Sequence, residues 1–372
     1  MGHEAVTRRC RRRRSAADAA MFGLATLGIA TPLLLLACTP TPSPTSPVSP
    51  KPTPAPKEAA EARSGDHGDP TPREPAPPQP KPDERAPPDG RTRVVLLGTG
   101  TPVADPERSG PCVAVVVDDQ PYLVDVGPGL VRRAAAAVQG AGVAALVPPR
   151  LNRAFITHLH SDHTVGLPDL IFTPWVLGRD GPLHLHGPPG LAKMAEHLHA
   201  AYSEDVAIRT GGLEHASAHG HEVQVHEIAA AAPSRVQVFK DARVEVTAFR
   251  VPHGSWEHAY GYRFKTPDRT IVISGDTGPS EAVVEACQGC DLLLHEVYSA
   301  EAFRRVPPGG QRYHGSFHTS TAELGRLAAR ARPGLLVLYH QLYWGRSDDD
   351  LVAEVRERYD GDVVSGRDLG VY

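Results

Sequence analysis

Three histidines and one aspartate fall within six residues, at His158, His160, Asp162 and His163. They directly follow an expected strand over residues 154–157. Because alternate residues of an extended segment share a face, His158 and His160 can reach one ion together. After a turn, Asp162 and His163 would point to a second ion nearby. Imidazole and carboxylate ligands suit zinc. The run therefore predicts a site for two metal ions at the end of a strand.

The first 38 residues have the order of an export signal. A basic run, Arg8–Arg14, precedes an apolar stretch that ends at Leu35-Leu36-Ala37-Cys38. Those four residues resemble the lipobox of bacterial lipoproteins, which implies that Cys38 carries a lipid anchor to a membrane. Thr39 after the cysteine implies an outer-membrane lipoprotein of the cell envelope. A plain transmembrane anchor is the alternative, and export through the Sec or the twin-arginine route stays open.

Residues 39–90 are rich in proline, since 17 of the 37 prolines fall between Pro40 and Pro88. Such a segment cannot bury a core and runs extended, so we expect a disordered tether. Residues 91–372 remain as one catalytic domain of ordinary globular composition. The formal net charge of -4 gives no case for a nucleic-acid partner.

Apolar runs and helical patterns alternate along residues 91–372. Short apolar runs predict strands at 94–97, 112–117, 122–125, 154–157, 244–249, 270–273 and 335–338. Helical patterns cover about 190–202, 280–287 and 321–331. The order predicts an α/β fold in which helices lie outside layered sheets.

Six motifs in sequence resemble the metallo-β-lactamase superfamily and, within it, the ribonuclease Z and arylsulfatase branch. The first is His158-x-His160-x-Asp162-His163. The others are Val251-Pro252-His253, Ser274-Gly275-Asp276-Thr277, Leu294-His295-Glu296, Phe317-His318-Thr319-Ser320 and Tyr339-His340. The resemblance covers nearly all of residues 91–372, and it implies a four-layer αβ/βα sandwich with the metals at one edge.

The resemblance also implies a role for each motif residue. Seven ligands would hold two zinc ions: His158, His160 and His253 the first, Asp162, His163 and His340 the second, with Asp276 bridging them. Manganese or iron would fit the same mixed set. A hydroxide between the ions would be the nucleophile, and Asp162 would orient it. His318 would donate a proton to the leaving oxygen and Glu296 would fix its imidazole; a simple buried pair is the alternative.

One feature departs from the ribonuclease Z pattern. Bacterial ribonucleases Z generally grip tRNA with a long arm between the strand at Tyr262-Arg263 and the motif that starts at Ser274. Residues 264–273 leave room only for a hairpin turn. The predicted export signal and the modest net charge also make nucleic acid an unexpected partner, and a small-molecule ester the expected substrate.

The remaining cysteines and histidines fit no motif. Cys287 and Cys290 allow either a local disulfide or two small buried residues. His258 would lie at the rim of the site. Eight further histidines are expected to be ordinary surface or core residues: His184, His186, His197, His199, His215, His219, His221 and His226.

Four functions therefore compete. The leading hypothesis is a dinuclear zinc hydrolase of phosphodiester or sulfate esters, because a proton donor helps a poor leaving group. The alternatives are a ribonuclease Z-type 3'-tRNA processing endonuclease, a lactone or β-lactam hydrolase, and a non-catalytic zinc-binding lipoprotein. A homodimer would fit the resemblance.

Overall fold

The computed structural model describes residues 91–232 and 234–372. The predicted signal, Cys38 and the tether lie in residues 1–90, outside the described residues. Within the described ranges, no helix combines the length and the apolar character needed to cross a membrane.

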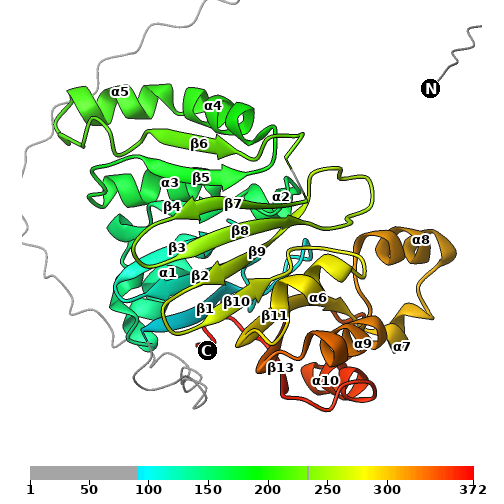
Figure 1. Ribbon diagram of the computed structural model, residues 1–372. Coiled ribbons are helices and arrows are strands. Elements are labelled where there is room, and N and C mark those ends of the chain that lie inside the picture. Colours follow the sequence, from blue (N-terminus) through cyan, green and yellow to red (C-terminus); the bar gives the residue numbers. More distant parts are fainter. Residues whose placement is uncertain (1–90, 233) are drawn as a thin grey trace, which may run out of the picture. The chain divides into compact units, whose positions relative to one another are not determined.

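Two mixed β-sheets form the centre of this part of the chain (Figure 1). The first has six strands in chain order: β1 (Thr92–Gly98), β2 (Cys112–Val117), β3 (Gln120–Val124), β4 (Arg153–Phe155), β5 (Leu183–Gly187) and β6 (Val223–Glu227). The second has seven, again neighbours in chain order: β7 (Arg235–Lys240), β8 (Glu245–Arg250), β9 (Tyr260–Lys265), β10 (Thr270–Ile273), β11 (Leu292–Tyr298), β12 (Leu335–Leu342) and β13 (Val363–Ser365).

The helices connect these strands. They are α1 (Leu130–Gly140), α2 (Ser161–Thr164), α3 (Leu167–Val176), α4 (Leu191–Ala201), α5 (Ser203–Gly211), α6 (Glu281–Cys287), α7 (Ala300–Phe303), α8 (Pro308–Phe317), α9 (Thr321–Ala331) and α10 (Asp348–Arg356). Two 3-10 turns, Ala144–Leu146 and Pro148–Arg150, precede β4. Figure 1 shows α4 and α5 beside β6, and α10 beside β13.

The core is arranged in layers. One buried cluster joins the facing sides of the two sheets, for example through Val115 and Phe264. A second lies between the first sheet and helices α1, α3 and α4, and includes Leu130. A third lies between the second sheet and helices α6, α9 and α10, and includes Leu324. Because both faces of each sheet are covered, strands such as β2 are apolar throughout. The predicted αβ/βα sandwich is confirmed.

Parallel strands of both sheets end at the edge where the motif residues lie. β10, β11 and β12 run parallel, with Ile273 opposite Leu294 and Leu294 opposite Val337. The pairing of β11 with β12 shifts between Glu296 and Val297, and the shift passes over His340. His340 has a positive φ of 48°. Such a bulge re-aims a side chain at a strand end, and here it turns His340 away from the regular alternation.

The short connection between β9 and β10 is also as predicted. Lys265 pairs with Thr270, so residues 266–269 form the turn of an antiparallel hairpin. Thr266 closes it by donating its backbone N–H to the carbonyl of Arg269 at 2.9 Å. No arm is inserted at this point of the described chain.

Candidate metal centre

The nitrogens of three histidines converge at the end of β4. His158 Nε2 lies 2.9 Å from His160 Nδ1, and His253 Nε2 lies 3.2 Å from the same atom. His253 comes from the loop between β8 and β9. With Asp276, these residues form a group whose ligand atoms all lie within 4.8 Å of one another. The first predicted ligand set is therefore brought together.

A second group stands beside it. His340 Nε2 lies 3.2 Å from Asp162 Oδ2, and His163 Nε2 lies 3.5 Å from the same oxygen. These three residues could hold a metal ion. Asp162 and His163 lie on the short helix α2, directly after His158 and His160. The turn expected within the run is thus the start of a helix.

Asp276 lies between the two groups. Its Oδ2 is 3.4 Å from His163 Nε2 and 3.6 Å from His340 Nε2. Burial alone would raise the pKa of this carboxyl, but His340 and His163 outweigh it and the pKa is held well below its usual range. A carboxylate that stays ionised in a buried place is suited to bridge two cations.

The donor set fits divalent metal ions. His163 Nε2 and Asp276 Oδ1 are buried and have no hydrogen-bond partner. Buried polar atoms are almost always paired, and a bound cation would supply the partner that these two atoms lack. Imidazole and carboxylate together suit zinc, and also manganese or iron.

Two residues that sequence reasoning missed hold the ligands in place. Asp125 follows β3 with a positive φ of 60°. It accepts hydrogen bonds from His163 Nδ1 at 2.8 Å and from the backbone N–H of Thr157 at 2.8 Å. Thr157 Oγ1 in turn contacts His158 Nδ1 at 2.9 Å. These bonds leave the Nε2 atoms of His158 and His163 for metal. An aspartate at the end of an apolar strand was the available signal.

The third histidine of the first group is oriented by α8. His253 Nδ1 donates to the carbonyl of Phe317 at 2.8 Å, which leaves its Nε2 facing His160. Trp256 Nε1 donates to His160 Nε2 at 2.7 Å. Neither Trp256 nor Phe317 was predicted to support a ligand, because nothing in the sequence near them points to a distant imidazole.

His318 and Glu296 are brought together as predicted. His318 Nδ1 lies 3.3 Å from Glu296 Oε2 and 3.9 Å from Asp276 Oδ2. Glu296 is fixed by the backbone N–H of Thr319, which donates to its Oε1 at 2.7 Å. Burial lowers the pKa of His318, but Glu296 and Asp276 outweigh it and raise it above its usual value. The imidazole is therefore able to carry a proton beside the centre. It also lies close enough to Asp276 and His340 to be a ligand instead.

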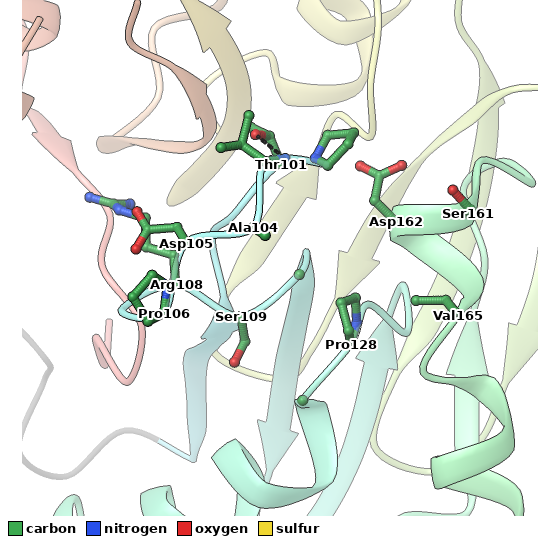
Figure 2. Close-up of a pocket in the computed structure, with 14 residues that line it drawn as sticks. Thr101, Ala104, Asp105, Pro106, Arg108, Ser109, Pro128, Ser161, Asp162 and Val165 are labelled. Atoms are coloured by element: carbon green, nitrogen blue, oxygen red, sulfur yellow. Dashed lines mark hydrogen bonds between the residues drawn. The ribbon is translucent and has the colours of Figure 1, made fainter. Parts of the chain in front are cut away.

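A hollow opens on one side of the centre (Figure 2). Its volume is about 470 Å³, and Asp162 and Ser161 line it opposite the loop at 101–109. A second hollow of about 290 Å³ lies on the other side of the same loop, against Tyr343 and Trp344. Arg108 lines both but is tied to Asp348, with Nη2 3.2 Å from Oδ1. Substrate can therefore reach the centre over an acidic and apolar surface on this flank.

The residues outside the motifs lie elsewhere. Cys287 and Cys290 form a disulfide, so one of the two open interpretations holds. His186 and His226 stack on adjacent strands, with ring centroids 4.5 Å apart. His258 is partly buried, in the loop that carries His253.

Comparison with known proteins agrees with the geometry. Residues 121–341 match the family described as the beta-lactamase superfamily domain. A ribonuclease Z of Mycobacterium bovis (strain BCG / Pasteur 1173P2) is 32% identical over 251 residues, which are 66% of this chain and 85% of that protein. A ribonuclease Z of Mycobacterium marinum is 30% identical over 282 residues, or 74% of this chain and 96% of that one.

Solved structures show the same fold. The metallo-beta-lactamase fold protein YhfI from Bacillus subtilis superposes with a TM-score of 0.57 at 18% identity, covering 76% of this chain and 98% of that one. The short form of human tRNase Z gives a TM-score of 0.56 at 23% identity, covering 75% and 98%.

Proposed function

Since the chain belongs to the metallo-β-lactamase superfamily of metal-dependent hydrolases, we propose that it hydrolyses phosphodiester bonds at the centre formed by residues 158–163, 253, 276 and 340. The observation that carries this proposal is Asp276, which lies between two ligand groups with His318 3.9 Å from its carboxylate. Two cation sites side by side suit a phosphoryl group, whose attacked and leaving oxygens both need charge stabilisation.

Individual residues of the chain would have separate roles in this hydrolysis. Divalent ions bound here would lower the pKa of water and polarise the phosphoryl oxygens. Asp162, which lines the hollow, would orient the attacking water. His318 would give its proton to the leaving oxygen, and the carboxylates of Glu296 and Asp276 favour its protonated form by raising its pKa above the usual value. Glu296 would hold that imidazole in orientation.

RNA is the substrate class that the relatives favour. The curated relatives quoted above are named ribonuclease Z and match most of their own length. This weighs against the expectation, drawn from net charge and the predicted export signal, that nucleic acid is not a partner. We therefore place cleavage of RNA phosphodiesters first.

Small phosphodiesters are the second candidate. The observation that favours them is the hairpin at residues 266–269, which leaves no arm between β9 and β10 for gripping a large RNA. Hydrolysis of sulfate esters and of lactones or β-lactams stays a prediction, which turnover of p-nitrophenyl sulfate and of nitrocefin would test.

An envelope location also remains a proposal. We propose that Cys38 is lipidated and that residues 39–90 hold the catalytic domain away from the membrane, on the strength of the sequence pattern alone. Mass spectrometry of the chain purified from membranes would show a diacylglycerol on Cys38 if this is so. An unmodified chain that begins before residue 38 would contradict it.

The test of the function is a substrate panel on the purified, metal-loaded protein. We expect turnover of bis(p-nitrophenyl) phosphate and of an RNA stem with a 3' extension. A chelator should abolish both, and zinc or manganese should restore them. His253→Ala should remove the activity, whereas Glu257→Ala, at an exposed position of the same loop, should retain it. A protein that binds two metal ions but turns over no ester would instead support the non-catalytic alternative.

A further inference from the structure

The centre has a second flank of quite different character, made by residues 304–317, which we call the arginine segment. It begins after α7, includes α8 and ends just before His318. No aspartate or glutamate occurs between Glu301 and Glu323, while Arg304, Arg305 and Arg312 all do. All three arginines are exposed. In a chain of net charge -4, this is a local basic surface beside the site.

An aromatic path joins this surface to the metal centre. The ring of Phe317 lies 5.0 Å from His253 and 6.1 Å from His160, measured between centroids. Tyr313 stacks on Phe317 with centroids 4.6 Å apart and planes at 27°. Tyr313 is 47% exposed. The outermost ring of the path is therefore open to a ligand, and the innermost touches the ligand histidines.

The path from Tyr313 to the centre is short. Tyr313 stacks on Phe317, and the ring centroid of Phe317 lies 5.0 Å from that of His253. A group stacked on Tyr313 would therefore lie one aromatic ring away from a proposed metal ligand.

The arginine segment is also held in one conformation. Gln311 Nε2 donates to the carbonyl of Phe303 at 3.2 Å and to that of Val306 at 2.9 Å. These bonds tie α8 to the end of α7 and fix Arg312 beside the turn that carries Arg304. Arg305 is partly engaged, with Nη2 3.3 Å from Glu301 Oε1. Arg304 and Arg312 are the cations left for a ligand.

We propose that the arginine segment binds single-stranded RNA, with a base stacked on Tyr313 and backbone phosphates held by Arg304 and Arg312. The inference rests on the proposed phosphodiesterase function and assigns it a substrate-binding surface. Exposed aromatic rings beside arginines are the combination that holds single strands, because rings stack on bases and guanidinium groups pair with phosphates. This surface would hold RNA at one flank of the centre, in place of the long arm that is expected in bacterial ribonucleases Z.

Binding can be measured apart from catalysis. A fluorescein-labelled eight-nucleotide single-stranded RNA is titrated with the chelator-treated full chain, and anisotropy is followed. We expect Tyr313→Ala to weaken binding about ten-fold, which is in the range of one base–ring stack, and Tyr313→Phe to bind like the parent. Arg304→Ala with Arg312→Ala should reduce the slope of log affinity against log salt by about one to two. Arg358→Ala, an exposed arginine after α10, is the matched control.

Turnover then separates this proposal from the proposed function. With metal-loaded protein, Tyr313→Ala should raise KM for RNA about ten-fold, whereas Arg358→Ala should change neither KM for RNA nor turnover of bis(p-nitrophenyl) phosphate. If no ester is hydrolysed but RNA binding still depends on Tyr313, the function fails and this surface stands. If the wild-type chain does not bind the RNA, or if these variants lose binding to anionic phospholipid vesicles and not to RNA, the proposal is overturned.

Discussion

Four of the seven proposed ligands come from one loop of the first sheet. The other three come from three separate segments of the second sheet, one of them the loop after β8. His158, His160, Asp162 and His163 all follow β4 within six residues. His253 and Asp276 follow β8 and β10, and His340 lies within β12. A local turn sets the spacing of the first set. The second set depends on the packing of strands that are far apart in sequence, so its geometry belongs to the fold as a whole.

Removing Asp276 should have the largest effect, because it is the second sheet's link to the first. Its Oδ2 lies 3.4 Å from His163 and 3.6 Å from His340. We expect Asp276→Ala to reduce kcat/KM for bis(p-nitrophenyl) phosphate by at least about a thousand-fold, since charge stabilisation of the transition state is commonly the largest catalytic contribution. Metal content by mass spectrometry should fall below two ions per chain.

Asp119→Ala is the control, because this aspartate is exposed at the turn between β2 and β3. It should retain both activity and metal. If Asp276→Ala keeps two metal ions, the two groups are independent and the proposed bridge is wrong.

This difference between one local segment and several separate ones also explains which ligands could be predicted from the sequence. The ligands in residues 158–163 could be predicted from their spacing in the sequence, because all of them lie in one loop. The helix over Thr321–Ala331 was predicted with the bounds it has, because Ser320 and Glu323 cap it reciprocally. His253, Asp276 and His340 could be assigned only through a family resemblance, since no local pattern tells where separate strand ends meet.

Other features of the structure could not be predicted from the sequence. β6 is half exposed and rich in polar residues, so it lacks the apolar signal of a buried strand. Asp125 bonds Thr157 and the ligand His163, which lie 32 and 38 residues away along the chain, and no spacing rule covers such contacts. Tyr313 and Phe317 stack as neighbours four residues apart on α8, but their place beside the ligand histidines depends on where α8 packs, which no local pattern gives.

Substitution of His318 would test whether the second sheet, through the connection between β11 and β12, also supplies the general acid. We expect His318→Ala to lower kcat by about a hundred-fold or more for RNA, whose alkoxide leaving group needs a proton. The loss should be smaller for bis(p-nitrophenyl) phosphate, because nitrophenolate leaves without one. Metal content should stay unchanged. A variant that loses metal would show instead that His318 is a ligand with Asp276 and His340, which its position allows.

Asp125 tests the first sheet in the same way. Its carboxylate accepts from His163 Nδ1 at 2.8 Å and binds Thr157, which contacts His158. We expect Asp125→Asn to weaken metal binding by about ten- to a hundred-fold, as is usual when the partner of a ligand imidazole is lost. Competition with a metal-sensitive dye would measure it. Asp241→Asn is the control, since Asp241 bonds Tyr122 and no ligand. An unchanged affinity would mean that the loop alone orders its histidines.

The smallest expected effect is a loss of stability in acid to which the first sheet contributes through His186. His186 on β5 is buried beside Arg153, His184 and His226, and burial followed by the charge of His226 and Arg153 lowers its pKa to about 3. Its unfolded value is near 6.5, so the unfolded chain binds the proton first. The stability that depends on neutral His186 is complete above about pH 6.5 and is lost as the pH falls from there toward 3. Between pH 7 and 5 the loss is at most about 2 kcal/mol, and less where water reaches the ring. Denaturant midpoints of the metal-free chain at these two pH values would measure it. His186→Leu should reduce the difference without abolishing it, because burial also lowers the pKa values of His253 and His295 to about 4. His197→Leu, at an exposed site on α4, should leave it unchanged. If His186→Leu also leaves the acid loss unchanged, neutral His186 does not contribute to it.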